Sequence, residues 1–282
     1  MRHLLAFMSP GRPCFPEALS AGDPVERHVY MQLTVERFDA LDRPLRVLEV
    51  GSWLGFSALT WAEALARRPH GGSVLCVDPW APYHTDEDAR TLDFPLRMDA
   101  ALRADIPYEV FLHNVRCAPR GVPIDHLRGR SRDVLRYLRD GWFDVVYVDG
   151  SHYYEDVLVD LREALRVTRA GGIVCGDDLE RQIGDDDVAR GIEGVSLDEV
   201  VRDDGTDTKL LPRERWYHPG VTRAVDEVLG RVSAWDGYWA VERTAEGVRD
   251  VALAPGRVFV PRHFGPEATR RLRVPAASWS VA

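Results

Sequence analysis

Two short acidic motifs carry the side chains whose types and spacing could do chemistry. Aspartate-glycine-serine-histidine runs from Asp149 to His152, and a pair of aspartates, Asp177 and Asp178, follows a glycine. Each motif comes after an apolar run, and like charges that lie together raise each other's pKa. A hard divalent cation with oxygen ligands would relieve that cost, and the absence of a cysteine or second histidine nearby in the sequence argues against zinc. The alternative interpretation is that each aspartate is a separate, solvated cap of a loop or helix.

The segment that would position such side chains reads RVLEVGSWLGFS from Arg46 to Ser57. Val47 to Val50 predicts a buried strand, Gly51 a turn that brings backbone close to a ligand, and Ser57 the start of a helix. This βα unit is typical of nucleotide-binding α/β domains. The dinucleotide pattern G-x-G-x-x-G is absent because Trp53 and Phe56 replace its later glycines, and the phosphate loop's lysine is also missing.

Further apolar runs predict a parallel, doubly wound sheet, since they alternate with helical segments. They cover residues 73–78, 124–131, 143–149 and 173–175. Ligands bind at the carboxyl ends of such strands. Asp78, which ends the second strand, can accept both hydroxyls of a ribose; the alternative is a capping or loop aspartate. Trp80 is interpreted as stacking on adenine, lining the acceptor site or packing in the core.

The pattern E-x-G-x-x-x-G-x-S, from Glu49 to Ser57, resembles motif I of class I S-adenosylmethionine-dependent methyltransferases. VDGSHYYEDVLVDL and GGIVCGDDL extend the resemblance to the metal-dependent small-molecule O-methyltransferases, both the catechol type and the sugar type of macrolide and aminocoumarin pathways. HPGVTRAVDEVL, from His218 to Leu229, is similar to the segment after the fifth strand in the sugar-modifying group. The similarity covers about residues 46–180 and 218–244.

This resemblance implies a Rossmann-like, seven-stranded, mostly parallel α/β sheet with an N-terminal lid helix and an insertion after the fifth strand. It implies that S-adenosylmethionine is bound by Glu49, Gly51, Ser52, Ser57, Asp78, Trp80, Ser131, Arg132 and Asp149. It also implies Mg²⁺, or another hard divalent cation, held by Asp149, Asp177 and Asp178. His152 occupies the position of a lysine base in the catechol enzymes and of a histidine base in one macrolide subgroup. Ser151 stands where another sugar subgroup has an aspartate base, so that base is absent.

The chemistry of His152 is coherent with that position. An alcohol attacks a sulfonium methyl group poorly because its proton is held tightly. Coordination to a cation lowers the pKa of the hydroxyl, and a neutral imidazole can take the proton near neutral pH. The cation would also orient a vicinal diol. The alternative is that His152 is a hydrogen-bonding residue of a loop.

The rest of the chain is interpreted as decoration of one domain at residues 46–262. Residues 1–45 form an N-terminal extension, in which Val25 to Leu41 predicts a helix that either covers the cofactor or packs on the sheet. Prolines at 95 and 107 are expected to break the helical patches of residues 81–122. The insertion, residues 179–217, is a solvated excursion or a substrate lid. Residues 238–244 and 248–253 predict an antiparallel pair, and 263–282 a tail.

Composition bounds the class of protein. The 282 residues are 45% hydrophobic and carry a net charge of −9, which argues against nucleic acid as the main partner. The four cysteines form no C-x-x-C pair, and no apolar stretch is long enough to span a membrane. We therefore expect a cytoplasmic enzyme that acts on a small-molecule hydroxyl, a sugar or alternatively a phenol, with a homodimer left open. An NAD-linked oxidoreductase and a non-catalytic cofactor-binding protein are the alternatives from other classes.

Overall fold

The computed structural model describes residues 8–20, 25–86, 88, 93–183, 207–211, 215–253, 257–264 and 280–281. The strands of its central sheet are β1 (Leu45–Val50), β2 (Gly72–Asp78), β3 (Ile124–Arg128), β4 (Phe143–Val148), β5 (Thr168–Leu179), β8 (Ser233–Trp235), β9 (Gly237–Arg243) and β10 (Val248–Asp250). They lie in the order β10-β9-β5-β4-β1-β2-β3, with β8 also pairing to β9. Two small sheets join β6 (Lys209–Leu211) to β7 (Arg215–Tyr217) and β11 (Arg257–Val258) to β12 (Ser280–Val281).

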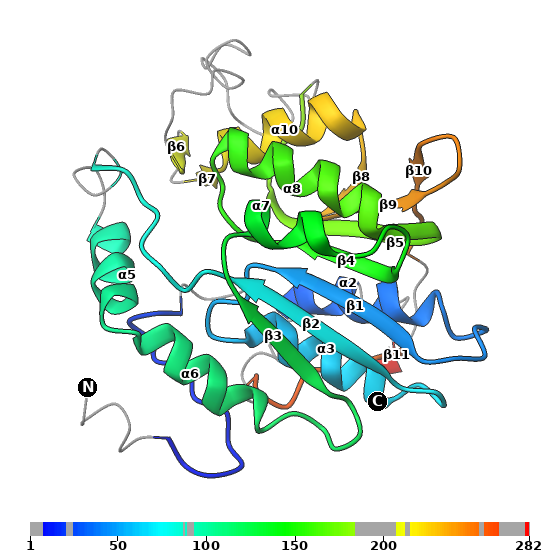
Figure 1. Cartoon of the computed structure of the whole chain (residues 1–282), viewed down its shortest axis with the longest axis horizontal. Coiled ribbons are helices and arrows are strands. Elements are labelled where there is room, and N and C mark those ends of the chain that lie inside the picture. The colour runs from blue at the N-terminus through cyan, green and yellow to red at the C-terminus, as the bar shows by residue number, and fades with distance from the viewer. Residues whose placement is uncertain are drawn as a thin grey trace.

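The helices lie on both faces of the sheet and beyond its carboxyl edge (Figure 1). They are α2 (Val25–Glu36), α3 (Phe56–Ala66), α5 (Asp93–Arg103), α6 (Ile106–Val115), α7 (Ser131–Val134), the 3₁₀ helix η1 (Leu135–Tyr137), α8 (Tyr154–Val167) and α10 (Pro219–Leu229). The neighbouring strands β3, β2, β1, β4 and β5 pair in parallel, and β9 pairs antiparallel to β5. This confirms the doubly wound α/β fold that the sequence predicts.

The outer edge of the sheet departs from a plain seven-strand count. β8 pairs with residues 238–240 of β9, whereas β10 pairs with residues 241–243 of the same strand. β8 and β10 therefore lie one after the other along the same strand, β9, and together occupy one position in the sheet. The sheet has seven positions across but eight strands.

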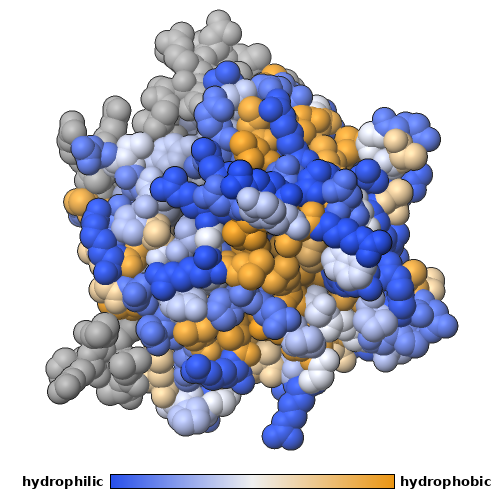
Figure 2. Space-filling view, in the orientation of Figure 1, coloured by the Kyte–Doolittle hydropathy of each residue, from blue (hydrophilic) through white to orange (hydrophobic). Residues whose placement is uncertain are grey.

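Alternation along the strands explains the two layers of the core. Leu45 and Val47 of β1 point into the cluster with α2 and α3, whereas Leu48 and Val50 point into the cluster with α8 and α10. Successive side chains of a strand point to opposite faces, so a strand covered on both sides is apolar at most positions. Each such buried side chain contributes about 1.5–3 kcal/mol. Hydrophilic residues cover much of the face seen in Figure 2, and apolar residues show mainly over its centre.

The two prolines expected to break helices instead lie within the first turns of helices. Pro107 is at the start of α6, and Pro95 is the third residue of α5. That expectation was wrong because the first turn of a helix has no intrahelical partner for its N–H groups, so proline costs little there. The third strand ends at Arg128 rather than at Ser131, which is the first residue of α7. Asp185 to Asp187 and Asp203 to Gly205, in the insertion, lie outside the described residues.

Candidate functional site: a cavity at the carboxyl edge of the sheet

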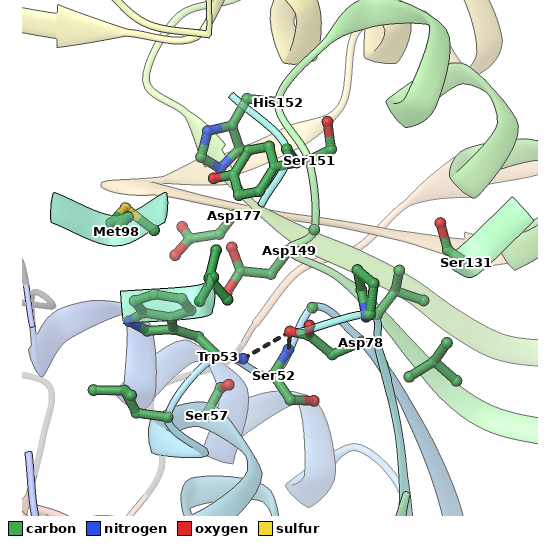
Figure 3. A pocket seen from close by; sticks show the side chains of 18 of the residues that line it. Ser52, Trp53, Ser57, Asp78, Met98, Ser131, Asp149, Ser151, His152 and Asp177 are labelled. Atoms are coloured by element: carbon green, nitrogen blue, oxygen red, sulfur yellow. Dashed lines mark hydrogen bonds between the residues drawn. The ribbon is translucent and has the colours of Figure 1, made fainter. Parts of the chain in front are cut away.

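The turn after β1 is built by close approach of two strands. Gly51 has φ +82°, and a Cβ on it would lie 1.9 Å from the carbonyl oxygen of Asp149 at the end of β4. Asp78, at the end of β2, then fastens the turn: its Oδ2 accepts the backbone N–H groups of Ser52 and Trp53 at 2.9 Å each (Figure 3). Its Oδ1 accepts the N–H of Trp80 at 2.6 Å. The glycine and the aspartate thus shape one rigid loop.

A cavity of about 350 Å³ opens beside this turn, at the carboxyl ends of β1, β2, β4 and β5. Its volume falls in the range of small-molecule sites. The predicted residues that line it are Gly51, Ser52, Ser57, Asp78, Ser131, Arg132, Asp149, His152, Asp177 and Asp178. Figure 3 shows Asp149 and Asp177 on one wall, with His152 above them and the Ser52–Asp78 turn below.

Two predicted cofactor residues do not line that cavity. Trp80 is 1% exposed, donates its Nε1–H to the carbonyl of Trp53 at 2.8 Å, and packs against Phe111. The prediction that it stacks on adenine or lines the acceptor site is wrong, since the ring points away into the core. Glu49 lies beneath the turn, fully buried, where it accepts the hydroxyl of Ser52 at 2.6 Å. Burial raises the pKa of Glu49 to about 7.

Ser131 and Arg132 lie on α7, the short helix after β3, which packs against α8 and β2. Arg132 donates to Asp156 of α8, and Asp156 also accepts the hydroxyl of Ser151 at 3.0 Å. The predicted contacts of Ser131 and Arg132 with an adenine edge stay a prediction. Their position on the cavity wall is compatible with it.

The acidic residues at the end of β5 are paired with an arginine from α2. Nη1 of Arg27 is 2.8 Å from Oδ2 of Asp177 and 3.1 Å from Oδ1 of Asp178. Asp178 has φ +61°, a left-handed conformation that is uncommon for a residue other than glycine. Such outliers persist where the surroundings hold them in place, as these ion pairs do.

His152 is held between two carboxylates. Its Nε2 lies 2.9 Å from Oδ2 of Asp178, and its Nδ1 lies 3.0 Å from Oδ1 of Asp207. Burial alone would lower the pKa of His152, but Asp207 and Asp178 raise it well above its ordinary value. The neutral imidazole expected from the sequence is therefore disfavoured in this arrangement, because each ring nitrogen lies beside a carboxylate oxygen.

The segment that begins α10 closes this side of the site. The ring of His218 lies 4.3 Å from that of His152, and its Nδ1 is 3.1 Å from Oε2 of Glu180. A Cβ on Gly220 would lie 2.2 Å from the carbonyl oxygen of His152, so a glycine there lets α10 pack on the loop that carries the histidine. This close packing gives a physical reason for the HPGV sequence.

The predicted magnesium ligands do not form one ligand set. Among the described residues, three sets of side chains bring ligand atoms within 4.8 Å of one another: Asp149, His152 and Asp178; Asp178, Glu180 and His218; and His152, Asp207 and His218. Asp177 is in none of these sets and is paired with Arg27. The trio of Asp149, Asp177 and Asp178 thus does not fit a cation as arranged here, and magnesium binding stays a prediction.

Several residues of the site were not identified from the sequence. Arg27 lines the cavity and Asp207 contacts His152, both from segments with no motif, and α5 supplies an apolar wall that includes Phe94 and Met98. The amphipathic pattern of α5 was a usable signal, since one face of that helix had to be covered. Of the described residues of α2, Arg27 is the one that lines the cavity, while Val29 and Met31 pack in the core.

The sheet order, the antiparallel strand beside β5 and the glycine turn after β1 together make a Rossmann-like α/β fold with a mostly parallel sheet, as the methyltransferase-like motifs of the sequence predict. Residues 48–179 match the family described as a methyltransferase domain. No helix in the described part of the chain is long and apolar enough to cross a bilayer.

One curated relative is the uncharacterized protein y4gI of Sinorhizobium fredii, which is 27% identical over 141 residues. That alignment covers 49% of this chain but 13% of the relative's length. Among solved structures, the O-methyltransferase NovP is 15% identical with a TM-score of 0.49, covering 78% of this chain and 80% of that one. Cofactor-bound Rv0187 from MTB is 17% identical with a TM-score of 0.46, covering 86% and 88%.

Proposed function

We propose that this chain is an S-adenosylmethionine-dependent O-methyltransferase that modifies a hydroxyl group of a small molecule. One observation carries the proposal: a single cavity joins the glycine turn after β1 to the His152–Asp178 pair. A cofactor pocket and groups that can manage a hydroxyl proton thus face the same space. The methyltransferase-domain match over residues 48–179 supports the donor half of this assignment.

The chemistry of the inner wall suits the cofactor. A carboxylate can accept about four hydrogen bonds, and Asp78 accepts three from backbone N–H groups. One acceptor position on Asp78 therefore remains for a ribose hydroxyl. Ser52, Ser57 and Asp149 offer polar contacts for a charged amino-acid end. When bound, S-adenosylmethionine supplies an electrophilic methyl group at this site. The protein's part is then to hold the acceptor oxygen in line and to take its proton.

We assign to His152 the role of the base that accepts the proton of the acceptor hydroxyl, and to Asp207 the role of orienting the ring. Nδ1 faces Oδ1 of Asp207, so a neutral ring that keeps its proton on Nδ1 would carry its lone pair on Nε2, on the side of Asp178. This role requires the imidazolium to lose its proton and the acceptor hydroxyl to replace Asp178 at Nε2. The pair Asp207–His152 then resembles other carboxylate–histidine pairs in which the acid fixes the tautomer of the base.

A sugar hydroxyl is the acceptor that we favour, and a phenol is the alternative. The support is the similarity of residues 218–229 to the sugar-modifying group, together with the contact that this segment makes with the loop of His152. Magnesium is part of the same expectation from the sequence, and it is the part to which the ligand geometry gives least support. The cytoplasmic location and the assembly state are likewise expectations.

The test is methyl transfer to a panel of acceptors. The purified chain is incubated with S-adenosylmethionine and either sugar diols or phenols, with and without EDTA, and products are analysed by mass spectrometry. We expect a mass gain of one methylene on members of the sugar panel, with S-adenosylhomocysteine formed in equal amount. The absence of methyl transfer to both the sugar diols and the phenols would contradict the O-methyltransferase assignment.

A further inference from the structure

Arg27 is the cation at the centre of the acidic edge of the sheet. Its side chain is 13% exposed, and every guanidinium nitrogen has a partner: Nη1 contacts Asp177 and Asp178, Nη2 lies 3.0 Å from Oε1 of Glu180, and Nε donates to the carbonyl of Asp236 at 2.9 Å. A guanidinium has a fixed, planar set of donors and stays charged at any pH that the folded chain tolerates. Its contacts reach residues 150 or more positions away in the sequence, so the fold itself brings it here.

The turn between β8 and β9 is shaped around that side chain. A Cβ on Gly237 would lie 2.4 Å from Nη2 of Arg27 and 2.9 Å from its Cζ, so a glycine leaves room for the guanidinium. The preceding residue, Asp236, accepts from Nε with its carbonyl and from the hydroxyl of Tyr30 with its carboxylate, at 3.1 Å. Tyr30 lies on α2, as Arg27 does. Two contacts from α2 and a glycine without a side chain thus form a cradle for one guanidinium.

We infer that Arg27 is a built-in counter-ion that takes the place of a divalent cation between Asp177 and Asp178. This deepens the proposed function and rests on it for the catalytic consequence alone, because cation binding can be measured without turnover. Two neighbouring carboxylates on adjacent residues need a positive partner, and the guanidinium satisfies both with one nitrogen. It also holds Asp178 where that carboxylate meets His152. Arg27 is therefore a positioning residue, supplied by α2 rather than by solvent.

This assignment makes a prediction that a metal enzyme would not meet. The purified chain should bind divalent cations weakly while Arg27 is in place. Removal of its charge should take away the cation that Asp177 and Asp178 share and create a cation site there. Because the coupling between two sites is typically 5–150-fold, we expect the gain in affinity to be roughly tenfold to a hundredfold.

The experiment is a Mn²⁺ titration of the full chain, followed by the electron paramagnetic resonance signal of free Mn²⁺, without cofactor. Arg27→Ala and the milder Arg27→Gln should both bind Mn²⁺ more tightly than the natural chain. Adding Asp177→Asn to either variant should reverse the gain. Arg37→Ala, which removes an arginine just after α2 that pairs with Glu242, should leave Mn²⁺ binding as in the natural chain.

Each outcome decides the inference. Tight Mn²⁺ binding by the natural chain would overturn it, and so would variants at Arg27 that fold yet gain no Mn²⁺ affinity. If both variants fail to fold, the natural chain's own titration decides. A parallel titration of S-adenosylhomocysteine in EDTA separates this inference from the proposed function: loss of that binding even with Mg²⁺ restored counts against the function, whereas binding that requires Mg²⁺ counts against Arg27 as the resident cation.

Discussion

Gly51 and Asp149 stand so close at the carboxyl edge of the sheet that a Cβ on the glycine would lie 1.9 Å from the aspartate's carbonyl oxygen. The contact joins the turn after β1 to the loop after β4, which leads on to His152. The pocket for the cofactor and the loop with the proposed base are therefore parts of one packed unit. A substitution in the turn should therefore affect both the cofactor pocket and the loop that carries His152.

Gly51→Ala should lose most affinity for S-adenosylhomocysteine. The alanine must push the Asp149 loop away in addition to adopting a left-handed conformation, which alone costs about 1–2 kcal/mol. Gly71→Ala is the matched control, since Gly71 has φ +57° but open space around its missing Cβ. Isothermal titration measures both variants. Equal affinities in the two would show that the contact between Gly51 and Asp149 does not shape the pocket.

His152→Ala should remove most turnover and leave affinity for S-adenosylhomocysteine nearly unchanged. A positioned base contributes roughly a hundredfold or more to rate, and Asp207→Asn should cause a smaller loss through the orientation of the ring. His70→Ala serves as a control, because His70 is exposed and pairs with Asp42 away from the site. Steady-state rates with saturating cofactor give the answer. Turnover like that of the natural chain in His152→Ala would sink the base assignment.

Glu49→Gln should make the chain more stable above neutral pH. Burial raises the pKa of Glu49 to about 7, so the folded state binds its proton more tightly than the unfolded state does. The stability from this group is complete below the unfolded pKa and is lost as pH rises through about 7, by up to about 3 kcal/mol. Glutamine carries no charge and avoids that loss. Urea unfolding near pH 5 and pH 8 measures the free energy of unfolding of both chains, and Glu155→Gln, at an exposed position, is the control. If Glu49→Gln stabilised the chain equally at both pH values, the raised pKa of Glu49 would not be the cause.

Asp144→Asn should destabilise the fold without touching the cavity. Although burial by itself raises the pKa of Asp144, hydrogen bonds from Arg43 and Arg169 lower it below its usual value. The stability it provides is therefore present above the unfolded pKa and is lost as pH falls through the folded pKa. We expect a loss of about 3 kcal/mol near neutral pH, shrinking in acid. A loss that is constant over this range, or a loss of cofactor binding, would contradict this account.

The succession of strands and helices along the chain and the positions of the central motifs were predictable because they depend on local pattern. The apolar run at residues 47–50 and the helix at residues 154–167 appear where the sequence places them. Asp78, Asp149 and His152 then had to meet at one edge, since parallel strands end on the same side. Such features need no knowledge of long-range contacts.

The parts that escaped prediction depend on contacts between distant segments. The sequence shows that Trp80 follows a strand but not which way its ring turns, and the ring points into the core. It shows three aspartates that need a cation, but an arginine on α2 meets two of them across 150 positions. Asp207 comes from an acidic insertion in which no single residue stands out. In each case tertiary packing decides which residue or orientation is used, and the sequence alone contains several chemically similar possibilities.

The central claim is that the cavity beside Gly51 binds S-adenosylmethionine for methyl transfer. The most direct test is isothermal titration of S-adenosylhomocysteine into the natural chain, with NADH titrated in parallel. The account predicts saturable one-to-one binding of the homocysteine product, competed by S-adenosylmethionine, and no heat from NADH. Binding of NADH without binding of S-adenosylhomocysteine would contradict the assignment from the glycine turn onward.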